Sequence, residues 1–328
     1  LFVSTPPVGL GTAGDLHLQI CSPAIDAAND ADAPANDLDG NARVDAITGS
    51  SVADVGAYEY QTASPIPGGN IWYVNAANAV SGHGKSWDCA SKELRVVVAR
   101  AVSGDQIWVA EGTYKPTSGT DRTISFQMKN GVEILGGFPN TGDPGLGDRD
   151  WAAHVTTLSG EIGAAGMTDN TLNIIKNTGL NLNATAVIDG FQIAFANGTN
   201  VRGGGIENGN NSSPTIRNCT FLSNSASYGG AINNNLNCSP TITNCTFTDN
   251  QATLSGGAVM CESGSAPTFD SCTFSNSSAV RYGGAIFLQA STMNATTIHR
   301  KMPPTMIIRG DMRPPGRPPP MGRDAGGR

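Results

Sequence analysis

The stretch Ser213-Pro-Thr-Ile-Arg-Asn-Cys-Thr-Phe221 is repeated twice further along the chain. It returns as Ser239-Pro-Thr-Ile-Thr-Asn-Cys-Thr-Phe247 and, with more changes, as Ala266-Pro-Thr-Phe-Asp-Ser-Cys-Thr-Phe274. Its cysteine recurs after 26 residues, from Cys219 to Cys245, and then after 27 residues, at Cys272. Self-similarity at a fixed period of this size is typical of a solenoid, in which each repeat packs only on its neighbours.

A glycine pair and a small apolar run precede each repeat, at 204–206, 229–232, 256–259 and 283–286. Leucine-rich repeats would need Leu at fixed spacings, and helical repeats would not tolerate this much Gly and Asn. Each repeat instead predicts three short strands: Gly-Gly-Ala-Ile, Pro-Thr-Ile and Cys-Thr-Phe. We therefore predict an all-β, right-handed parallel β-helix, with coils of 26–27 residues stacked about 4.8 Å apart.

The alternation of side chains predicts a bend inside each repeat. Cys219 and Phe221 share one face of a strand, whereas Ile216, three residues before Cys219, should face the other way. Both sets face inward if Asn218 adopts the left-handed conformation, which Asn tolerates. Ser271 is then the imperfect third member of the bend column. The predicted structural ladder comprises Asn218, Asn244, Cys219, Cys245, Cys272, Phe221, Phe247 and Phe274.

The remainder of the chain predicts a tandem organisation. Residues 71–289 form the β-helix, and its cap at 71–103 includes an amphipathic helix over 91–102, because open solenoid ends need covering. Residues 62–70 are a Pro/Gly linker, and residues 1–61 are the C-terminal end of an upstream β-helix, so that the chain is part of a longer protein. From 290 to 328 proline is too dense for a sheet, and we expect a disordered or frameshifted tail.

Composition excludes some classes of function. The formal net charge is −7, whereas a nucleic-acid partner would require basic clusters. No run of residues is long and apolar enough for a membrane span. Seven cysteines cannot all pair within one chain, and the sequence leaves the disulfide state open.

Candidate sites are sparse, and the sequence indicates no catalytic residue and no organic cofactor. On the Gly-Gly-Ala strands the positions that could face outward carry Glu207 and Asn208, then Asn233 and Asn234, then uncharged residues. That pattern contains no column of acids, so Glu207 is expected to be a solvated surface residue. Asp37 and Asp39, with Asp30 and Asp32 nearby, suggest a Ca²⁺ site because Ca²⁺ prefers hard oxygen ligands. The alternative is a turn with exposed acids.

Several segments resemble known families. Gly104-Asp-Gln-Ile-Trp-Val-Ala-Glu-Gly-Thr-Tyr114 resembles the first coil of pectin-lyase-like β-helix proteins. The Gly-Gly-Ala-Ile runs, with Phe221-Leu-Ser-Asn224 and Phe247-Thr-Asp-Asn250, look like the repeats of polymorphic outer-membrane adhesins. Residues 21–60 resemble the choice-of-anchor Q module of bacterial surface proteins. These resemblances imply the fold and a bacterial, extracellular or outer-membrane-associated location, but they imply little about activity.

Two functional hypotheses follow. The first is a structural or adhesin-like surface protein, without evident catalysis, whose loops contact carbohydrate or a host or cell-surface protein. The alternative is a polysaccharide lyase or glycoside hydrolase of the pectin-lyase-like fold, with its site in the loops at 137–150 or outside this chain. A charged cluster on one face of adjacent coils would favour the enzyme, because acid and base roles need separate groups.

Overall fold

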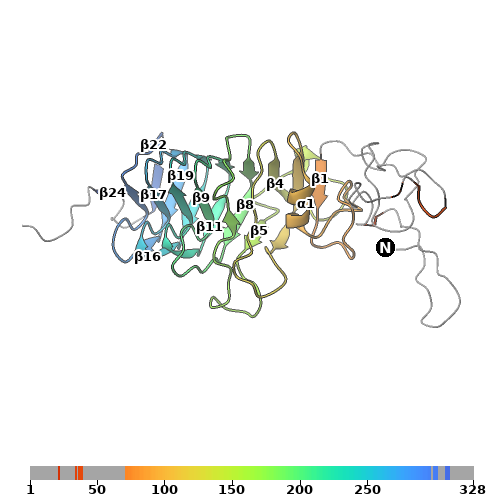
Figure 1. Ribbon diagram of the computed structural model, residues 1–328, viewed down its shortest axis with the longest axis horizontal. Helices are drawn as coiled ribbons and strands as arrows, with labels where there is room; N and C mark the ends of the chain where they lie inside the picture. Colours follow the sequence, from red (N-terminus) through yellow and green to blue (C-terminus); the bar gives the residue numbers. More distant parts are fainter. Residues whose placement is uncertain are drawn as a thin grey trace, which may run out of the picture.

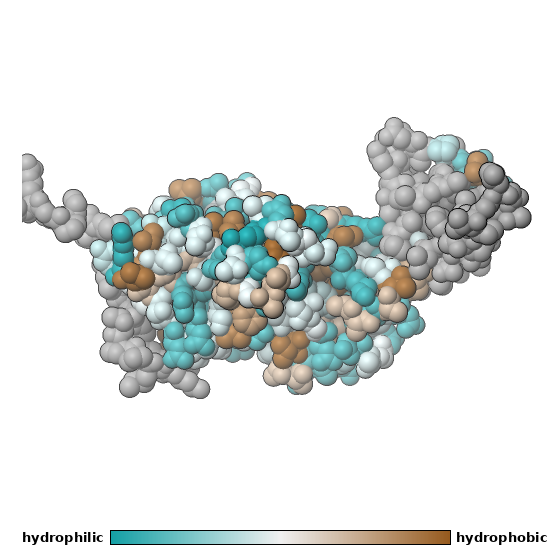
Figure 2. Space-filling model, turned by 90° about the horizontal axis from the view of Figure 1, so that it is seen from below, coloured by the Kyte–Doolittle hydropathy of each residue, from teal (hydrophilic) through white to brown (hydrophobic). Residues whose placement is uncertain are grey.

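A computed structural model describes residues 21–22, 34, 36–39, 71–296, 298–301 and 307–310 of the chain. The predicted domain boundaries at residues 61 and 70 lie outside these ranges and stay predictions. The described core is a stack of coils along the long axis of the molecule, with α1 and β1 towards one end and β22 and β24 towards the other (Figure 1). The space-filling view from below shows hydrophilic and hydrophobic residues mixed over the surface of this stack (Figure 2). Within these ranges no helix is long and apolar enough to cross a membrane.

Every strand pairing within the four sheets is parallel and links one coil to the next, which defines a parallel β-helix. The first sheet contains β1 (Ile71–Val74), β2 (Gln106–Ala110), β4 (Glu133–Phe138), β7 (Val187–Asp189), β10 (Thr215–Arg217), β14 (Thr241–Thr243), β18 (Thr268–Asp270) and β22 (Asn294–Ala295). The second contains β3 (Gly112–Tyr114), β5 (Thr156–Ser159), β8 (Phe191–Ala194), β11 (Thr220–Leu222), β15 (Thr246–Thr248), β19 (Cys272–Ser275) and β23 (Ile298–Lys301).

The third sheet carries the Gly-Gly-Ala-Ile segments. It contains β6 (Ile175–Lys176), β9 (Ile206–Gly209), β13 (Ile232–Asn235), β17 (Val259–Glu262), β21 (Ile286–Gln289) and β24 (Ile307–Gly310). A short fourth sheet lies between the second and third in three of the coils and was not expected from the sequence. It contains β12 (Ser225–Tyr228), β16 (Gln251–Ser255) and β20 (Ser278–Ala279).

Identical side chains stack inside the helix because neighbouring coils pair in register. Phe221 pairs with Phe247, and Phe247 with Phe274. The first two rings are 4.8 Å apart and the second two 4.5 Å apart, nearly parallel in both cases. Phe221 and Phe247 are fully buried, and Phe274 is nearly so. This column is the centre of the apolar core.

The bend predicted between the first and second sheets is present in three coils. Asn218, Asn244 and Ser271 have φ of 54°, 52° and 53°, in the left-handed region. The Asn244 Nδ2 donates to Asn218 Oδ1 at 2.7 Å, so the amides form a ladder between coils. Ser271 donates to its neighbour Asp270 at 3.3 Å and does not extend that ladder.

The cysteines of the repeat lie just after this bend, with Cys219, Cys245 and Cys272 buried and unpaired. Their sulfur atoms face backbone carbonyls two residues earlier, at 3.1 to 3.3 Å. Burial raises the pKa of the Cys245 thiol well above its usual value, which disfavours the reactive thiolate. These thiols serve as small core side chains.

Two further Asn ladders run inside the β-helix, and the sequence did not predict them. Asn177 donates to Asn208 and Asn208 to Asn234, both at 3.0 Å, and all three residues are buried. Asn224 and Asn250 form a second buried ladder beside the Phe column. The outward placement considered for Asn208 and Asn234 is therefore wrong, because they alternate with the outward Glu207 and Asn233.

The capping helix is present but shorter than the range 91–102. α1 spans Leu94–Arg100, and it buries Leu94, Val97 and Val98 against the first core residues. It begins late because Ser91 pairs with β1, donating its N–H to the Tyr73 carbonyl and accepting the Asn75 N–H. A short 3₁₀ turn, η2, spans Leu146–Asp148 in the loop after β4.

The β-helix also continues beyond the boundary expected at residue 290. β22 pairs with β18, β23 with β19 and β24 with β21, all parallel. Residues 302–306 and 311–328, which hold the dense prolines, lie outside the described ranges. The disordered or frameshifted tail stays a prediction for those residues, whereas β22 to β24 follow the coil register past residue 290.

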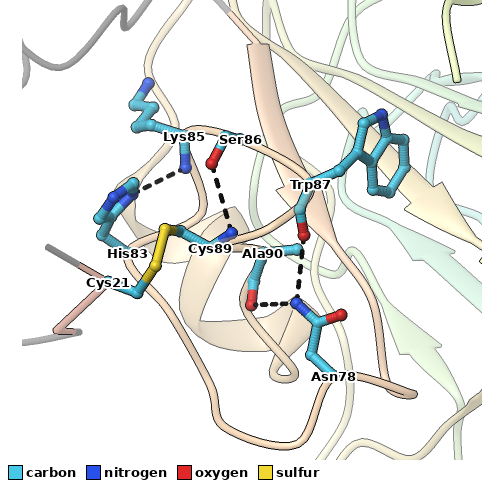
Figure 3. The surroundings of a disulfide bond; sticks show 8 residues. All are labelled: Cys21, Asn78, His83, Lys85, Ser86, Trp87, Cys89 and Ala90. Carbon is cyan, nitrogen blue, oxygen red and sulfur yellow. Dashed lines mark hydrogen bonds between the residues drawn. A yellow bond between two sulfur atoms is a disulfide. The ribbon is translucent and has the colours of Figure 1, made fainter. Parts of the chain in front are cut away.

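A disulfide joins Cys21 to the loop before α1. Its partner is Cys89, 68 residues later, with 4.9 Å between the Cα atoms. In Figure 3 the bond lies beside a loop that Asn78 closes by donating to the carbonyls of Trp87 and Ala90. The bond fixes Cys21 to the capped end of the stack.

Candidate ligand-binding face

The strongest candidate site lies on the outward face of the third sheet. Its first column is set by strand register and runs through Lys176, Glu207, Asn233, Met260 and Phe287. Their strand neighbours on either side, such as Ile206 and Ile232, face the core. The sequence predicts this column only from Glu207 onward, with no charge beyond that residue, and the strand register adds Lys176.

A second column stands beside the first, at the turn that precedes each glycine pair. Bridges between coils align Arg202 with Tyr228, Tyr228 with Ser255, and Ser255 with Tyr282. The following glycine, for example Gly229, has a positive φ of 63°, and a Cβ there would lie 2.2 Å from the Ile232 carbonyl oxygen. Only glycine fits this turn, so the residue before it is held at the same place in every coil.

Arg202, in the turn column, reaches across two coils to Glu262, which lies two residues beyond Met260 on β17. Its Nε contacts Glu262 Oε1 at 2.7 Å, although the two residues are 60 apart in sequence. Its guanidinium also lies over the Tyr228 ring, 5.2 Å from the centroid. The hydrogen bond to Glu262 raises the pKa of Arg202, although burial opposes the shift. We call the set Lys176, Arg202, Glu207, Asn233 and Glu262 the Glu207–Glu262 face.

Both carboxylates of this face have a cationic partner. Lys176 Nζ lies 3.4 Å from Glu207 Oε2, and Glu262 Oε1 accepts from Asn233 Nδ2 at 3.2 Å as well as from Arg202. The Glu207 and Glu262 side chains are 17% and 11% exposed, so both remain reachable from solvent. Both carboxylates of the face are thus ion-paired and partly exposed.

Two amide oxygens on the middle strand of the face have no hydrogen-bond donor within the described part of the chain. They are the Oδ1 atoms of Asn233 and Asn235, both on β13 and both inaccessible to solvent. A buried acceptor without a donor costs about 1–3 kcal/mol. The face therefore holds two buried acceptors that lack a donor.

The face becomes aromatic towards the C-terminal coils. The Tyr282 ring stacks on Phe287 with centroids 5.4 Å apart and an interplanar angle of 18°. Tyr282 is 41% exposed, whereas Phe287 and Met260 are buried. A charged and amide-rich half thus adjoins an aromatic half along the axis of the stack.

A second charged cluster lies outside the first sheet. Asp189 accepts from Arg149 at 2.7 Å and from Arg217 at 2.6 Å, and Asn218 donates to it at 2.8 Å. Burial raises the pKa of Asp189, but these hydrogen bonds outweigh it and leave the pKa below its usual 3.8. Arg217 also approaches Glu133 at 3.8 Å. Every charge here is paired, which indicates a structural network.

This network explains the loop at 137–150, where the enzyme hypothesis expected a site. Arg149 anchors the loop to Asp189 and to the Gly136 carbonyl, and Trp87 donates to the Pro144 carbonyl at 2.9 Å. Beneath the loop, Trp108 stacks on Phe138 at 4.8 Å in a small apolar cluster outside the coil. Packing and these hydrogen bonds account for the position of Arg149, and the enzyme hypothesis stays a prediction.

The proposed Ca²⁺ ligands lie near the N-terminus. Asp37 is buried and accepts the backbone N–H of Asp39 at 2.9 Å, as in a turn. Asp30 and Asp32 lie outside the described residues. Where the structure describes the chain, no group of three or more His, Cys, Asp and Glu side chains is placed to hold a metal ion. The Ca²⁺ hypothesis stays a prediction.

The residues of the turn column were missed, but a signal for them exists. Arg202, Tyr228, Ser255 and Tyr282 each stand immediately before a glycine pair. Aligning the repeats on those pairs would have placed the four in one column. The contact from Arg202 to Glu262 would still have been missed, because side-chain reach across two coils is not a property of the repeat.

Comparison with known proteins supports the fold. Residues 159–301 match a family model described as a right-handed β-helix region. Comparison with curated proteins and with solved structures finds no match. With the parallel pairing described above, the family match shows that the described stack of coils is a right-handed parallel β-helix.

Proposed function

We propose that this chain is an extracellular or cell-surface β-helix protein whose Glu207–Glu262 face and adjoining turn column bind an extended carbohydrate chain. The observation that carries the proposal is the periodic arrangement of the two outward columns. Side chains at one position recur about every 4.8 Å along the axis, which suits a ligand with its own short repeat lying parallel to the stack.

The chemistry of the two columns favours carbohydrate. Tyr228 and Tyr282 are two coils apart, about 10 Å, and aromatic rings pack against the apolar faces of sugars. The partly exposed carboxylates accept hydrogen bonds from hydroxyl groups. Such a mixed aromatic and polar surface serves binding without requiring a proton donor.

Location and partners form part of the same proposal. The disulfide between Cys21 and Cys89 supports a compartment outside the cytosol, where such bonds persist. The resemblances to adhesin repeats and to the choice-of-anchor Q module support a bacterial surface. A host or cell-surface protein is the other partner class, contacted through loops, and nucleic acid is not expected.

A depletion assay against a polysaccharide panel tests the proposal, with binding and the formation of reducing or unsaturated ends both measured. Tyr282→Ala and Glu262→Gln should each reduce retention, whereas Thr241→Ala, on the exposed surface of the first sheet, should not. If all three variants were retained equally by the polysaccharide, the Glu207–Glu262 face would not be the binding site.

The enzyme alternative keeps one supporting observation, namely two carboxylates on one outward face. If Glu207→Gln or Glu262→Gln abolished the release of new chain ends while binding persisted, the chain would be a lyase or hydrolase. Binding without new ends in the unmodified protein favours the display function.

A further inference from the structure

A second hollow lies at the capped end of the stack, next to the Lys176 end of the Glu207–Glu262 face, since Lys176 donates its backbone N–H to the Phe126 carbonyl. It is formed by the exposed side of α1, the segment 123–129 and Leu180, and its volume is about 610 Å³. Volumes between about 300 and 1,000 Å³ are typical of small-molecule sites. We call this hollow the α1 groove.

The floor of the α1 groove is apolar and its rim is basic. Val98 and Met128 are buried beneath it, with Ile124 and Leu180 half-buried beside them. Among the described residues no acidic side chain lines this groove, although the chain as a whole carries a net charge of −7. The groove is therefore locally positive on an acidic protein.

The cations of the groove are Arg95 and Lys129, and they differ in how they are held. The Lys129 ammonium donates to the carbonyls of Ala99 and Ala101, at 3.2 and 2.5 Å, at the C-terminal end of α1. Arg95 is exposed, and it forms no ion pair with any residue that the structure describes. An exposed guanidinium without an ion-pair partner can bind a carboxylate through two parallel hydrogen bonds, as a bidentate pair.

We propose that the α1 groove binds a small amphiphile with one carboxylate, its apolar part on Val98 and Met128 and its carboxylate on Arg95. Charge complementarity selects this occupant, since an apolar floor with a cationic rim and no acid fits an alkyl or aryl carboxylate. A neutral apolar ligand would leave Arg95 unused, and a cationic ligand would be repelled by it.

Isothermal titration calorimetry of the full chain with decanoate tests the proposal. We expect saturable binding at one site, weakened about tenfold or more by Arg95→Glu, because a charge-assisted hydrogen bond is lost. Ala99→Trp should also weaken binding, because Ala99 is exposed and its enlarged side chain would fill the groove. Lys115→Glu makes the same charge change outside the groove. Val96→Trp places the same Trp side chain elsewhere on α1. Both control variants should bind decanoate as tightly as the unmodified chain does.

Four outcomes would overturn the proposal. They are the absence of saturable binding, equal binding of decanol, unchanged affinity in Arg95→Glu, and sedimentation velocity showing a dimer that Ala99→Trp dissociates. The last would make a second copy the occupant. Far-UV circular dichroism of each variant ensures that a lost affinity is not a lost fold.

Discussion

Replacing the central ring of the aromatic column tests whether stacking between coils stabilises this fold. Phe247 is fully buried, and its ring contacts Phe221 at 4.8 Å and Phe274 at 4.5 Å. Phe247→Leu keeps most of the apolar surface but removes two aromatic pairs. At about 0.5–1.5 kcal/mol for each pair, the expected loss of unfolding free energy is about 1–3 kcal/mol. Phe247→Ala adds a cavity, and its cost should be about 3–5 kcal/mol.

Phe221→Leu is the matched control, since Phe221 stacks only on Phe247 among the described aromatic residues. Its expected cost is about 0.5–1.5 kcal/mol, half that of the central position. Urea unfolding followed by circular dichroism and by fluorescence gives the free energies, and coincident transitions justify a two-state fit. If Phe247→Leu cost no more than Phe221→Leu, ring stacking would not be the source of the stability.

Three further changes probe the bend, the charge network and the disulfide. Asn244→Ala should lower the free energy of unfolding by about 1–2 kcal/mol, because the backbone of Asn244 is in the left-handed region. Asn244→Gly should lower it less, because glycine adopts that conformation readily. Equal thermal unfolding midpoints for the two variants would contradict this. Asp189 has a lowered folded pKa, so its stabilising contribution is complete above the unfolded value near 3.9 and is lost as pH falls through the folded pKa. The stability advantage of the unmodified chain over Asp189→Asn should therefore shrink below about pH 4, and an advantage independent of pH would refute the assignment. Reducing the bond between Cys21 and Cys89, which closes a loop of 68 residues, should lower the free energy of unfolding by about 4 kcal/mol. The stability of Cys89→Ser should not change on adding reductant. If the stability of the unmodified chain did not change either, the bond would be excluded.

The repeat could be read from the sequence because its determinants are local. The period of 26–27 residues, the parity of Ile216 against Cys219 and the tolerance of Asn218 for the left-handed region depend on residues a few positions apart. Together they predict the strands, the bend and the inward columns. The helix was expected as well, although its first turn is lost because Ser91 pairs with β1 instead.

The candidate site depended on contacts that the repeat does not encode. Arg202 meets Glu262 across 60 residues, and Arg149 reaches Asp189 from a loop outside the coil. The bond from Cys21 to Cys89 likewise joins segments that no pattern connects. The sequence by itself determined the coil, because strand parity and turn preferences act over a few residues. Only the tertiary structure decided which charges meet, because stacking brings distant residues within about 5 Å of each other while side-chain length and rotamer choose the partner.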